Sequence, residues 1–170
     1  MILTDQFVFR AILRETDPEA IGELVRSAGF FYQEEIEIAV QLARERIMKG
    51  ENSGYFFLLA DIGNELAGYA CFGPVPGAKD TWDLYWVAVH DHFRGKGLGS
   101  IILDKSIGIM SHSGARQVYA ETSSREMYHA THQFYEKNEF LIVARLKDFY
   151  DLGDDKLIYM RKFMKGLVFD

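Results

Sequence analysis

The residues whose types are best suited to binding a ligand or taking part in a reaction lie in one stretch, His90 to Ser100. This stretch reads HDHFRGKGLGS. It holds three glycines within five residues, two basic side chains and a His-Asp-His cluster. Glycine lets a backbone adopt positive φ and approach an anion closely, whereas imidazole and carboxylate groups are frequent metal ligands. The stretch is therefore a candidate phosphate loop, a candidate metal site or an ordinary turn.

The segments around this stretch favour an anion site. A strand is predicted at Trp82 to Val89, before the glycines, and an apolar helix from Gly97 to about Ser111 after them. The first turn of a helix leaves backbone N–H groups unpaired and carries partial positive charge. Two nucleotide fingerprints are excluded by register: GxxxxGK[ST] lacks its first glycine, and GxGxxG meets Ser100 or Ile102 at its last position.

A metal site at His90, Asp91 and His92 is the weaker interpretation. Adjacent loop residues rarely converge on one ion without distant partners. The remaining histidines, His112, His129 and His132, have no spacing that ties them to this stretch. We therefore predict no metal.

The pattern that fits is R-x-x-G-x-G, from Arg94 to Gly99, directly after LYWVAV. It resembles the pyrophosphate-binding loop of the GNAT superfamily, the acetyl-CoA-dependent N-acetyltransferases. Three further segments are similar to the family, FVFRAILRETDPEAIGEL, GARQVYAETSS and HATHQFYEKNEF, and the tail ARLKDFYDLGDDKLIYMRKF resembles a subset of its members. The resemblance implies an α/β fold of the α+β type in one domain, residues 1–170. Its central sheet is expected to be mixed and mostly antiparallel, with about seven strands and about four flanking helices.

Local signals place the elements in the order β-α-α-β-β-β-α-β-α-β-β. Asp17 before Pro18 predicts an N-cap, and Gly63-Asn64 predicts a hairpin turn. Helices are expected to about Ala28, over Gln33 to Lys49 and over Arg125 to Lys137. The first strand is expected over Phe7–Arg14. The last three strands are expected over Arg116–Thr122, Phe140–Phe149 and Lys156–Phe163.

The resemblance also assigns the cofactor, acetyl-CoA, which serves as a cosubstrate. Backbone groups of the strand end would meet the pantetheine arm, and backbone N–H groups of the loop would hold the pyrophosphate. Lys96 either adds charge there or is a solvated loop lysine. The strand-end residues are Val87, Ala88 and Val89; the loop residues are Arg94, Gly95, Lys96, Gly97, Leu98, Gly99 and Ser100.

Acetyl transfer to an amine needs a base for the amine, polarisation of the carbonyl and a proton for the leaving thiolate. Tyr135 matches the family tyrosine proposed as the acid. Asp83 and Glu121 both match positions where family members carry a catalytic glutamate, and His90 is a further candidate base. Cys71 lies in an apolar run, so we expect a buried, inert thiol.

Two positions depart from the family pattern. Tyr128 stands where many members carry an asparagine that contacts pantetheine. Glu139 replaces a glycine, so Asn138 is expected to take the left-handed conformation instead.

The acceptor is expected to be a primary amine, on a small molecule or a protein N-terminus. Aromatic side chains are its candidate walls, and nearby acids would suit a cationic amine. The aromatics are Phe30, Phe31, Tyr32, Tyr85, Tyr128, Phe149 and Tyr150; the acids are Glu34, Glu35, Asp151, Asp154 and Asp155. The alternatives are a non-catalytic acyl-CoA-binding regulatory module and an unrelated nucleotide-binding domain.

The composition of the chain argues against several classes of binding partner. A net charge of −6 argues against a nucleic-acid binder that neutralises phosphates. The single cysteine excludes a disulfide framework within the chain, and no apolar run is long enough for a bilayer. We expect a cytoplasmic protein without membrane contact, with a homodimer as one option.

Overall fold

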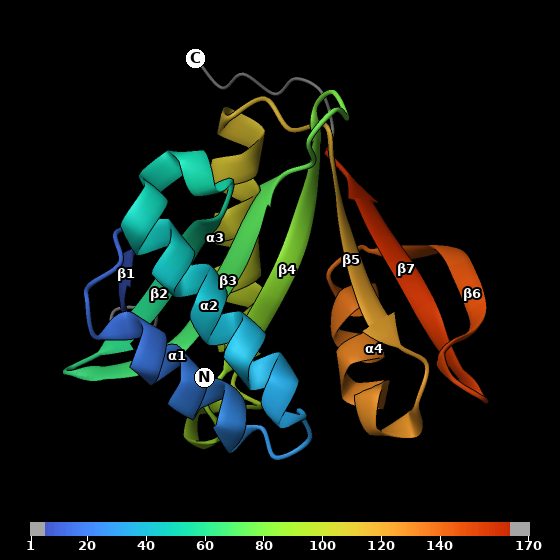
Figure 1. The fold of residues 1–170 in the computed structure, drawn as a ribbon, viewed down its shortest axis with the longest axis horizontal. Coiled ribbons are helices and arrows are strands. Elements are labelled where there is room, and N and C mark those ends of the chain that lie inside the picture. Colours follow the sequence, from blue (N-terminus) through green and yellow to red (C-terminus); the bar gives the residue numbers. More distant parts are fainter. Residues whose placement is uncertain (1–5, 164–170) are drawn as a thin grey trace. The chain divides into compact units, whose positions relative to one another are not determined.

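The computed structural model describes residues 6–163. In chain order, the strands and α-helices of these residues are β1 (Val8–Arg10), α1 (Asp17–Ser27), α2 (Gln33–Lys49), β2 (Phe56–Ile62), β3 (Glu65–Pro74), β4 (Thr81–Val89), α3 (Leu98–His112), β5 (Gln117–Ser123), α4 (His129–Lys137), β6 (Leu141–Asp151) and β7 (Asp154–Lys162) (Figure 1). This content and order confirm the predicted α/β fold class.

The strands follow the order β1-β2-β3-β4-β5-β7-β6 in one sheet. β2 pairs antiparallel with β1 and β3, and β7 pairs antiparallel with β5 and β6. The pairing of β4 with β5 is parallel. The sheet is therefore mixed and mostly antiparallel, as predicted.

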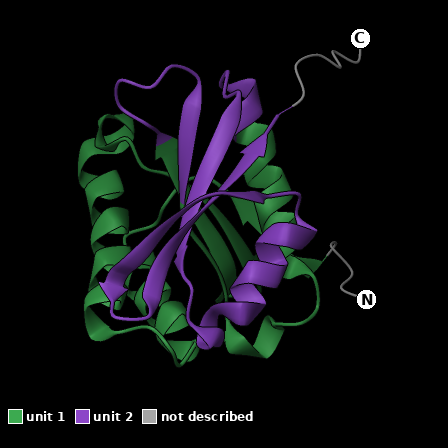
Figure 2. Cartoon of the chain, turned by 90° about the vertical axis from the view of Figure 1, so that its right-hand side faces the viewer, with its two compact units in different colours: residues 1–73, 85–109 green, residues 74–84, 110–170 purple. Residues whose placement is uncertain are grey.

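Contacts divide the chain into two compact units (Figure 2). Unit 1 comprises residues 1–73 and 85–109, and unit 2 comprises residues 74–84 and 110–170. The boundary crosses β4, so Asp83 belongs to unit 2 whereas Val87, Ala88 and Val89 belong to unit 1. Each unit is described separately below.

In unit 1, α1 and α2 cover one face of β2 and β3 (Figure 1). Ile21, Leu24 and Val25 of α1 are almost completely buried against apolar residues of the strands. Spacings of three and four residues put these side chains on one face of the helix. Cys71 lies in the same cluster, so its expected burial is confirmed, and burial raises the pKa of its thiol.

The close approach of α3 to β3 requires Gly68. A Cβ atom at this position would lie 2.6 Å from Cδ1 of Ile102 and 3.1 Å from the carbonyl oxygen of Ala88. Any larger residue would push α3 and the end of β4 away from β3. Gly68 thus positions the segment between β4 and α3, which contains the predicted loop.

In unit 2, α4 packs against β7 through aromatic rings. The ring centroids of Tyr135 and Tyr159 are 5.1 Å apart, and those of Tyr135 and Phe140 are 5.3 Å apart. β6 forms the edge of the sheet next to β7 (Figure 1). Most of its residues are exposed.

Three local expectations were wrong. Asp17 is the first residue of α1 and not its N-cap; its buried carboxylate instead binds Arg10 at 2.6 Å. The helix expected from Arg125 begins as a 3-10 turn, Glu126–Tyr128, and becomes α-helical only at His129. The first strand is shorter than expected and ends at Arg10, whose side chain forms ion pairs with Asp17 and Asp61.

The turn after α4 is also different. Glu139 itself has φ 66°, whereas Asn138 stays at φ −95°. Arg161 offsets the strain, because one guanidinium nitrogen binds the Glu139 carboxylate at 2.8 Å and another donates to the Asn138 carbonyl at 3.2 Å. Within residues 6–163, no helix has both the length and the apolar character needed to span a bilayer.

Candidate active site

The predicted glycine loop lies between a 3-10 turn, Asp91–Phe93, and the start of α3. Gly95 has φ 69° and Gly97 has φ 87°, which are left-handed values that disfavour other residues. A Cβ atom at either position would meet nothing within 4 Å. These glycines are therefore required by backbone conformation and not by lack of space.

The loop is fixed by hydrogen bonds to its own surroundings in unit 1. The His90 amide donates to Ala67 of β3 at 2.9 Å, and Nε of Arg94 donates to the Val89 carbonyl at 3.1 Å. Nζ of Lys96 donates to the His92 carbonyl at 3.2 Å. Both basic side chains thus hydrogen-bond to carbonyl groups of the residues that precede the loop.

The composition of the loop fits an anionic pyrophosphate. Residues 94–100 carry two cations and no acidic side chain, and they end in the first turn of α3, where amide groups lack helical partners. The exposed glycines leave the backbone accessible. Upstream, Val87, Ala88 and Val89 are half-buried at the end of β4.

Two carboxylates occupy neighbouring strands of unit 2. Asp83 on β4 is in register with Tyr119 on β5, and Glu121 lies two residues further along β5. Because side chains alternate along a strand, Asp83, Tyr119 and Glu121 share one face of the sheet. Burial raises the pKa of the half-buried Asp83 carboxyl, and the negative charge of Glu121 raises it further.

Glu121 has a different environment from Asp83. Its carboxylate, on a side chain 52% exposed, forms an ion pair with Nζ of Lys156 on β7. That ammonium group also lies 4.3 Å from the centroid of the Phe149 ring. Lys156 thus provides a charge partner for Glu121, whereas Asp83 is half-buried with a raised pKa, which suits a proton acceptor.

Tyr135 is 7% exposed in the aromatic cluster of unit 2. Burial raises the pKa of its phenol, and the neighbouring Tyr159 raises it further. The phenol therefore keeps its proton throughout the physiological range.

Comparison with known proteins agrees with this architecture. The profile of a family described as "Acetyltransferase (GNAT) family" matches residues 16–140. The chain belongs to the GNAT acetyltransferase family. Its enzyme class is therefore acyltransferase, as expected. No curated protein matches the sequence.

Solved structures of GNAT proteins share the fold. A Desulfovibrio desulfuricans protein described as a GNAT-family acetyltransferase is 40% identical, with a TM-score of 0.90 over 92% of this chain and 98% of its own. The ribosomal-protein-S18-alanine N-acetyltransferase from Escherichia coli is 20% identical, with a TM-score of 0.73 over 96% of this chain and 99% of its own. An aminoglycoside 6'-N-acetyltransferase in complex with coenzyme A is 14% identical, with a TM-score of 0.73 over 94% and 98%.

Two of the acids expected to attract an amine serve the GNAT fold instead. Asp154 is 4% exposed and binds Arg125 at 2.9 Å. Asp155 is 7% exposed, forms an ion pair with Arg145 and accepts a hydrogen bond from the Asp148 amide at 2.8 Å. Burial and pairing occupy both carboxylates, so that part of the hypothesis was wrong.

The expected aromatic walls divide between the units. In unit 1, Phe30 contacts Phe31, with ring centroids 4.4 Å apart, and Phe31 packs on Trp86 at 5.0 Å. In unit 2, Phe149 and Tyr150 remain about half exposed at the end of β6, with centroids 5.0 Å apart. Tyr128 is half-buried and ends the 3-10 turn before α4.

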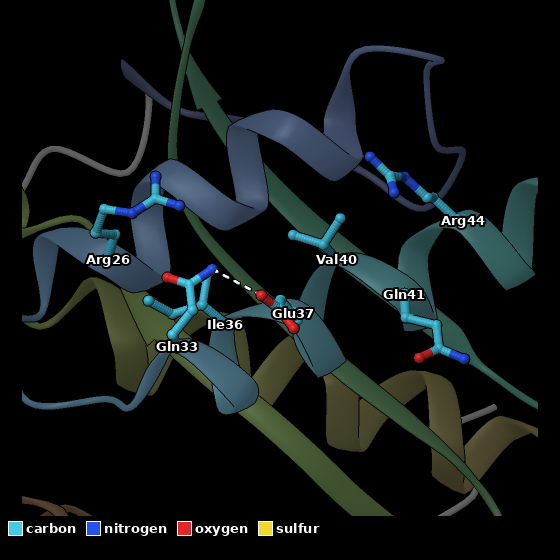
Figure 3. A pocket seen from close by; sticks show the side chains of 7 residues that line it. All are labelled: Arg26, Gln33, Ile36, Glu37, Val40, Gln41 and Arg44. Atoms are coloured by element: carbon cyan, nitrogen blue, oxygen red, sulfur yellow. Dashed lines mark hydrogen bonds between the residues drawn. The ribbon is translucent and has the colours of Figure 1, made fainter.

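A pocket in unit 1 lies outside the predicted site (Figure 3). It encloses about 450 Å³ and is lined by Arg26 of α1 and by Gln33, Ile36, Glu37, Val40, Gln41 and Arg44 of α2. Two of its charged groups already have partners, because Glu37 accepts from Gln33 at 3.0 Å and Arg44 binds Glu19 at 2.8 Å. The pocket is a groove of the helical layer.

Sequence reasoning missed Lys156 as the partner of Glu121. The two residues are far apart in the sequence, and the register of β5 with β7 brings them together. No local pattern signals such a pair.

Proposed function

We propose that this protein transfers the acetyl group of acetyl-CoA directly to a primary amine. The observation that carries the proposal is the glycine loop before α3, with left-handed Gly95 and Gly97 and no acidic side chain over residues 94–100. Backbone amides in such a loop bind a pyrophosphate without regard to side-chain identity. When bound, acetyl-CoA would supply the activated acetyl group.

Asp83 is the proposed general base. Its raised pKa and half-buried position support this role, because a base works best with a pKa near the operating pH. Directly or through a water molecule, the carboxylate would accept the proton that the amine loses as its nitrogen bonds to the acetyl carbon. Glu121 would act by charge, raising the pKa of Asp83.

Tyr135 is the proposed acid. As the carbon–sulfur bond breaks, its phenol would donate a hydrogen bond, and finally the proton, to the leaving thiolate. The high pKa of Tyr135 supports this role because the group stays protonated until it is needed. Val87, Ala88 and Val89 would supply the backbone groups that orient the pantetheine arm and polarise the thioester carbonyl.

For the acceptor, we propose an amine on a small molecule or a protein N-terminus. The structural relatives include an aminoglycoside N-acetyltransferase and a ribosomal-protein N-acetyltransferase. The acceptors in both classes are primary amines. The exposed rings of Phe149 and Tyr150 support an amphipathic acceptor. A non-catalytic acyl-CoA-binding module is the alternative; Asp83 with its raised pKa favours the enzyme.

One experiment tests these assignments. Thiol release from acetyl-CoA is measured against amino acids, polyamines, aminoglycosides and N-terminal peptides, and the best acceptor is repeated with Asp83→Asn, Tyr135→Phe and Glu121→Gln. The enzyme predicts turnover with at least one acceptor class and a loss of at least about tenfold for Asp83→Asn and Tyr135→Phe. Binding of acetyl-CoA without turnover of any amine would instead support the regulatory module.

A single domain, a cytoplasmic location and homodimer formation stay predictions. A single cooperative unfolding transition would support the single domain. The molar mass of the protein in solution tests homodimer formation.

A further inference from the structure

Three potential metal ligands converge at one corner of unit 1. Glu65, His90 and His92 each offer one ligand atom, and these atoms lie within 4.8 Å of one another. The sequence pattern at His90 and His92 lacked a distant ligand, and Glu65, at the start of β3, supplies it. The three residues come from two separate segments of the chain, which is the feature that distinguishes a metal site from a chance pair of loop histidines.

The segment that carries both histidines is held in place without a metal. The His90 amide donates to the Ala67 carbonyl at 2.9 Å, two residues from Glu65 on the same strand. The Asp91 amide donates to Oγ of Ser27 at 3.2 Å, and the Phe93 ring packs edge-on against Phe7 at 6.1 Å. The backbone positions of the ligands are therefore preorganised, so an ion would have to order only side chains.

The charge around the cluster suits a dication. Glu65 contributes one negative charge, and Asp91 contributes another beside the imidazoles, with Oδ1 2.8 Å from Nδ1 of His90 and 3.8 Å from Nε2 of His92. A carboxylate next to a metal-binding histidine commonly orients the ring and increases its basicity. Asp91 is in position to do this for His90.

We infer that Glu65, His90 and His92 form a binding site for a divalent transition-metal ion of the Zn²⁺ class. Two imidazole nitrogens and one carboxylate oxygen are the donors that Zn²⁺ accepts, whereas Mg²⁺ and Ca²⁺ prefer sites made of oxygen alone. Water would complete the coordination. The ion would link β3 to the turn that leads into the glycine loop, and it would stabilise the folded loop without taking part in acetyl transfer.

The three ligand atoms must move slightly closer together to bind one ion. A tetrahedral ion with bonds of about 2.1 Å needs its ligand atoms about 3.4 Å apart. The ring of His92 is 71% exposed, and its centroid already lies 4.7 Å from that of His90, with the planes tilted by 56°. Glu65 is exposed as well, so both side chains can close on an ion that enters from solvent.

The test uses the full chain without an affinity tag and without acetyl-CoA, so its outcome is independent of the proposed function. Titration with Zn²⁺ in a calorimeter is expected to show one equivalent bound and a higher melting temperature, and Co²⁺ is expected to give visible absorption bands of nitrogen and oxygen coordination. Mg²⁺ is expected to give neither effect. Glu65→Gln and His92→Asn should each weaken Zn²⁺ binding at least about tenfold, since loss of an outer-shell partner alone costs 10–100-fold.

Two matched variants serve as controls. Glu23→Gln removes an exposed carboxylate of α1, and His129→Asn removes an exposed imidazole of α4; both should bind Zn²⁺ as the unaltered protein does. Absence of saturable Zn²⁺ binding would overturn the inference, and so would equal affinity in Glu65→Gln, His92→Asn and the controls.

Discussion

The glycine loop of unit 1 and the carboxylate pair of unit 2 are built on opposite principles. The loop presents backbone amides from one continuous segment, and its two basic side chains hydrogen-bond to carbonyls of the loop's own entry segment. Asp83 and Glu121 are side chains on different strands, and the negative charge of Glu121 raises the pKa of Asp83. A backbone site depends on chain conformation, whereas an acid–base pair depends on single side-chain atoms. Substitutions should therefore have different kinetic signatures in the two regions.

Asp83→Asn is expected to have the largest effect. It removes the proposed base while keeping the shape of the side chain, so kcat should fall about 10²–10⁴-fold with little change in the KM for acetyl-CoA. The measurement is steady-state thiol release. A loss below about tenfold would exclude Asp83 as the base.

The same variant makes a prediction about stability. A carboxyl whose pKa is raised in the folded state favours folding below its unfolded pKa, and that contribution is lost as the pH rises through the folded value. Asp83→Asn should therefore melt at an equal or higher temperature than the unaltered protein at neutral pH. A lower melting temperature would show that Asp83 has a structural role instead.

Tyr135→Phe is expected to rank second, with kcat at least about tenfold lower. Phenylalanine keeps the ring contacts with Phe140 and Tyr159, so the melting temperature should stay close to that of the unaltered protein. Tyr159→Phe is the matched control, because it removes a buried hydroxyl that has no hydrogen-bond partner within the described residues. Equal losses in both variants would point to altered packing in place of proton donation.

Gly97→Ala tests the loop. An alanine at φ 87° costs about 1–2 kcal/mol, so the KM for acetyl-CoA should rise about 5–30-fold while kcat changes little. Lys96→Ala is the comparison, because it removes a side chain and leaves the backbone intact; its KM should rise less. A larger effect for Lys96→Ala would mean that the loop binds through charge and not through its amides.

Glu121→Gln is expected to have the smallest effect at neutral pH. Removing its negative charge lowers the pKa of Asp83, so the acid limb of the kcat profile should move to lower pH. The measurement is kcat over the whole pH range in which the protein stays folded. Loss of kcat across this whole range would identify Glu121 itself as the base.

Much of the fold could be predicted because its signals are local. The end of α2 before Gly50 and the hairpin between β2 and β3 were found where glycine and asparagine indicated them. The predictions failed where a distant residue decides a local conformation. Arg10 draws Asp17 away from capping, and Arg161 supports Glu139 in a conformation that glycine usually adopts.

The sequence by itself determined the glycine loop, its helix and the membership in the GNAT family, because backbone stereochemistry is specified by neighbouring residues. Only the tertiary structure decided the environment of each side chain. Tertiary contacts placed Glu121 beside Asp83 and Lys156, paired the buried Asp154 and Asp155 with arginine residues, and brought Glu65 to His90 and His92. These contacts join residues far apart along the chain, so no local pattern in the sequence signals them.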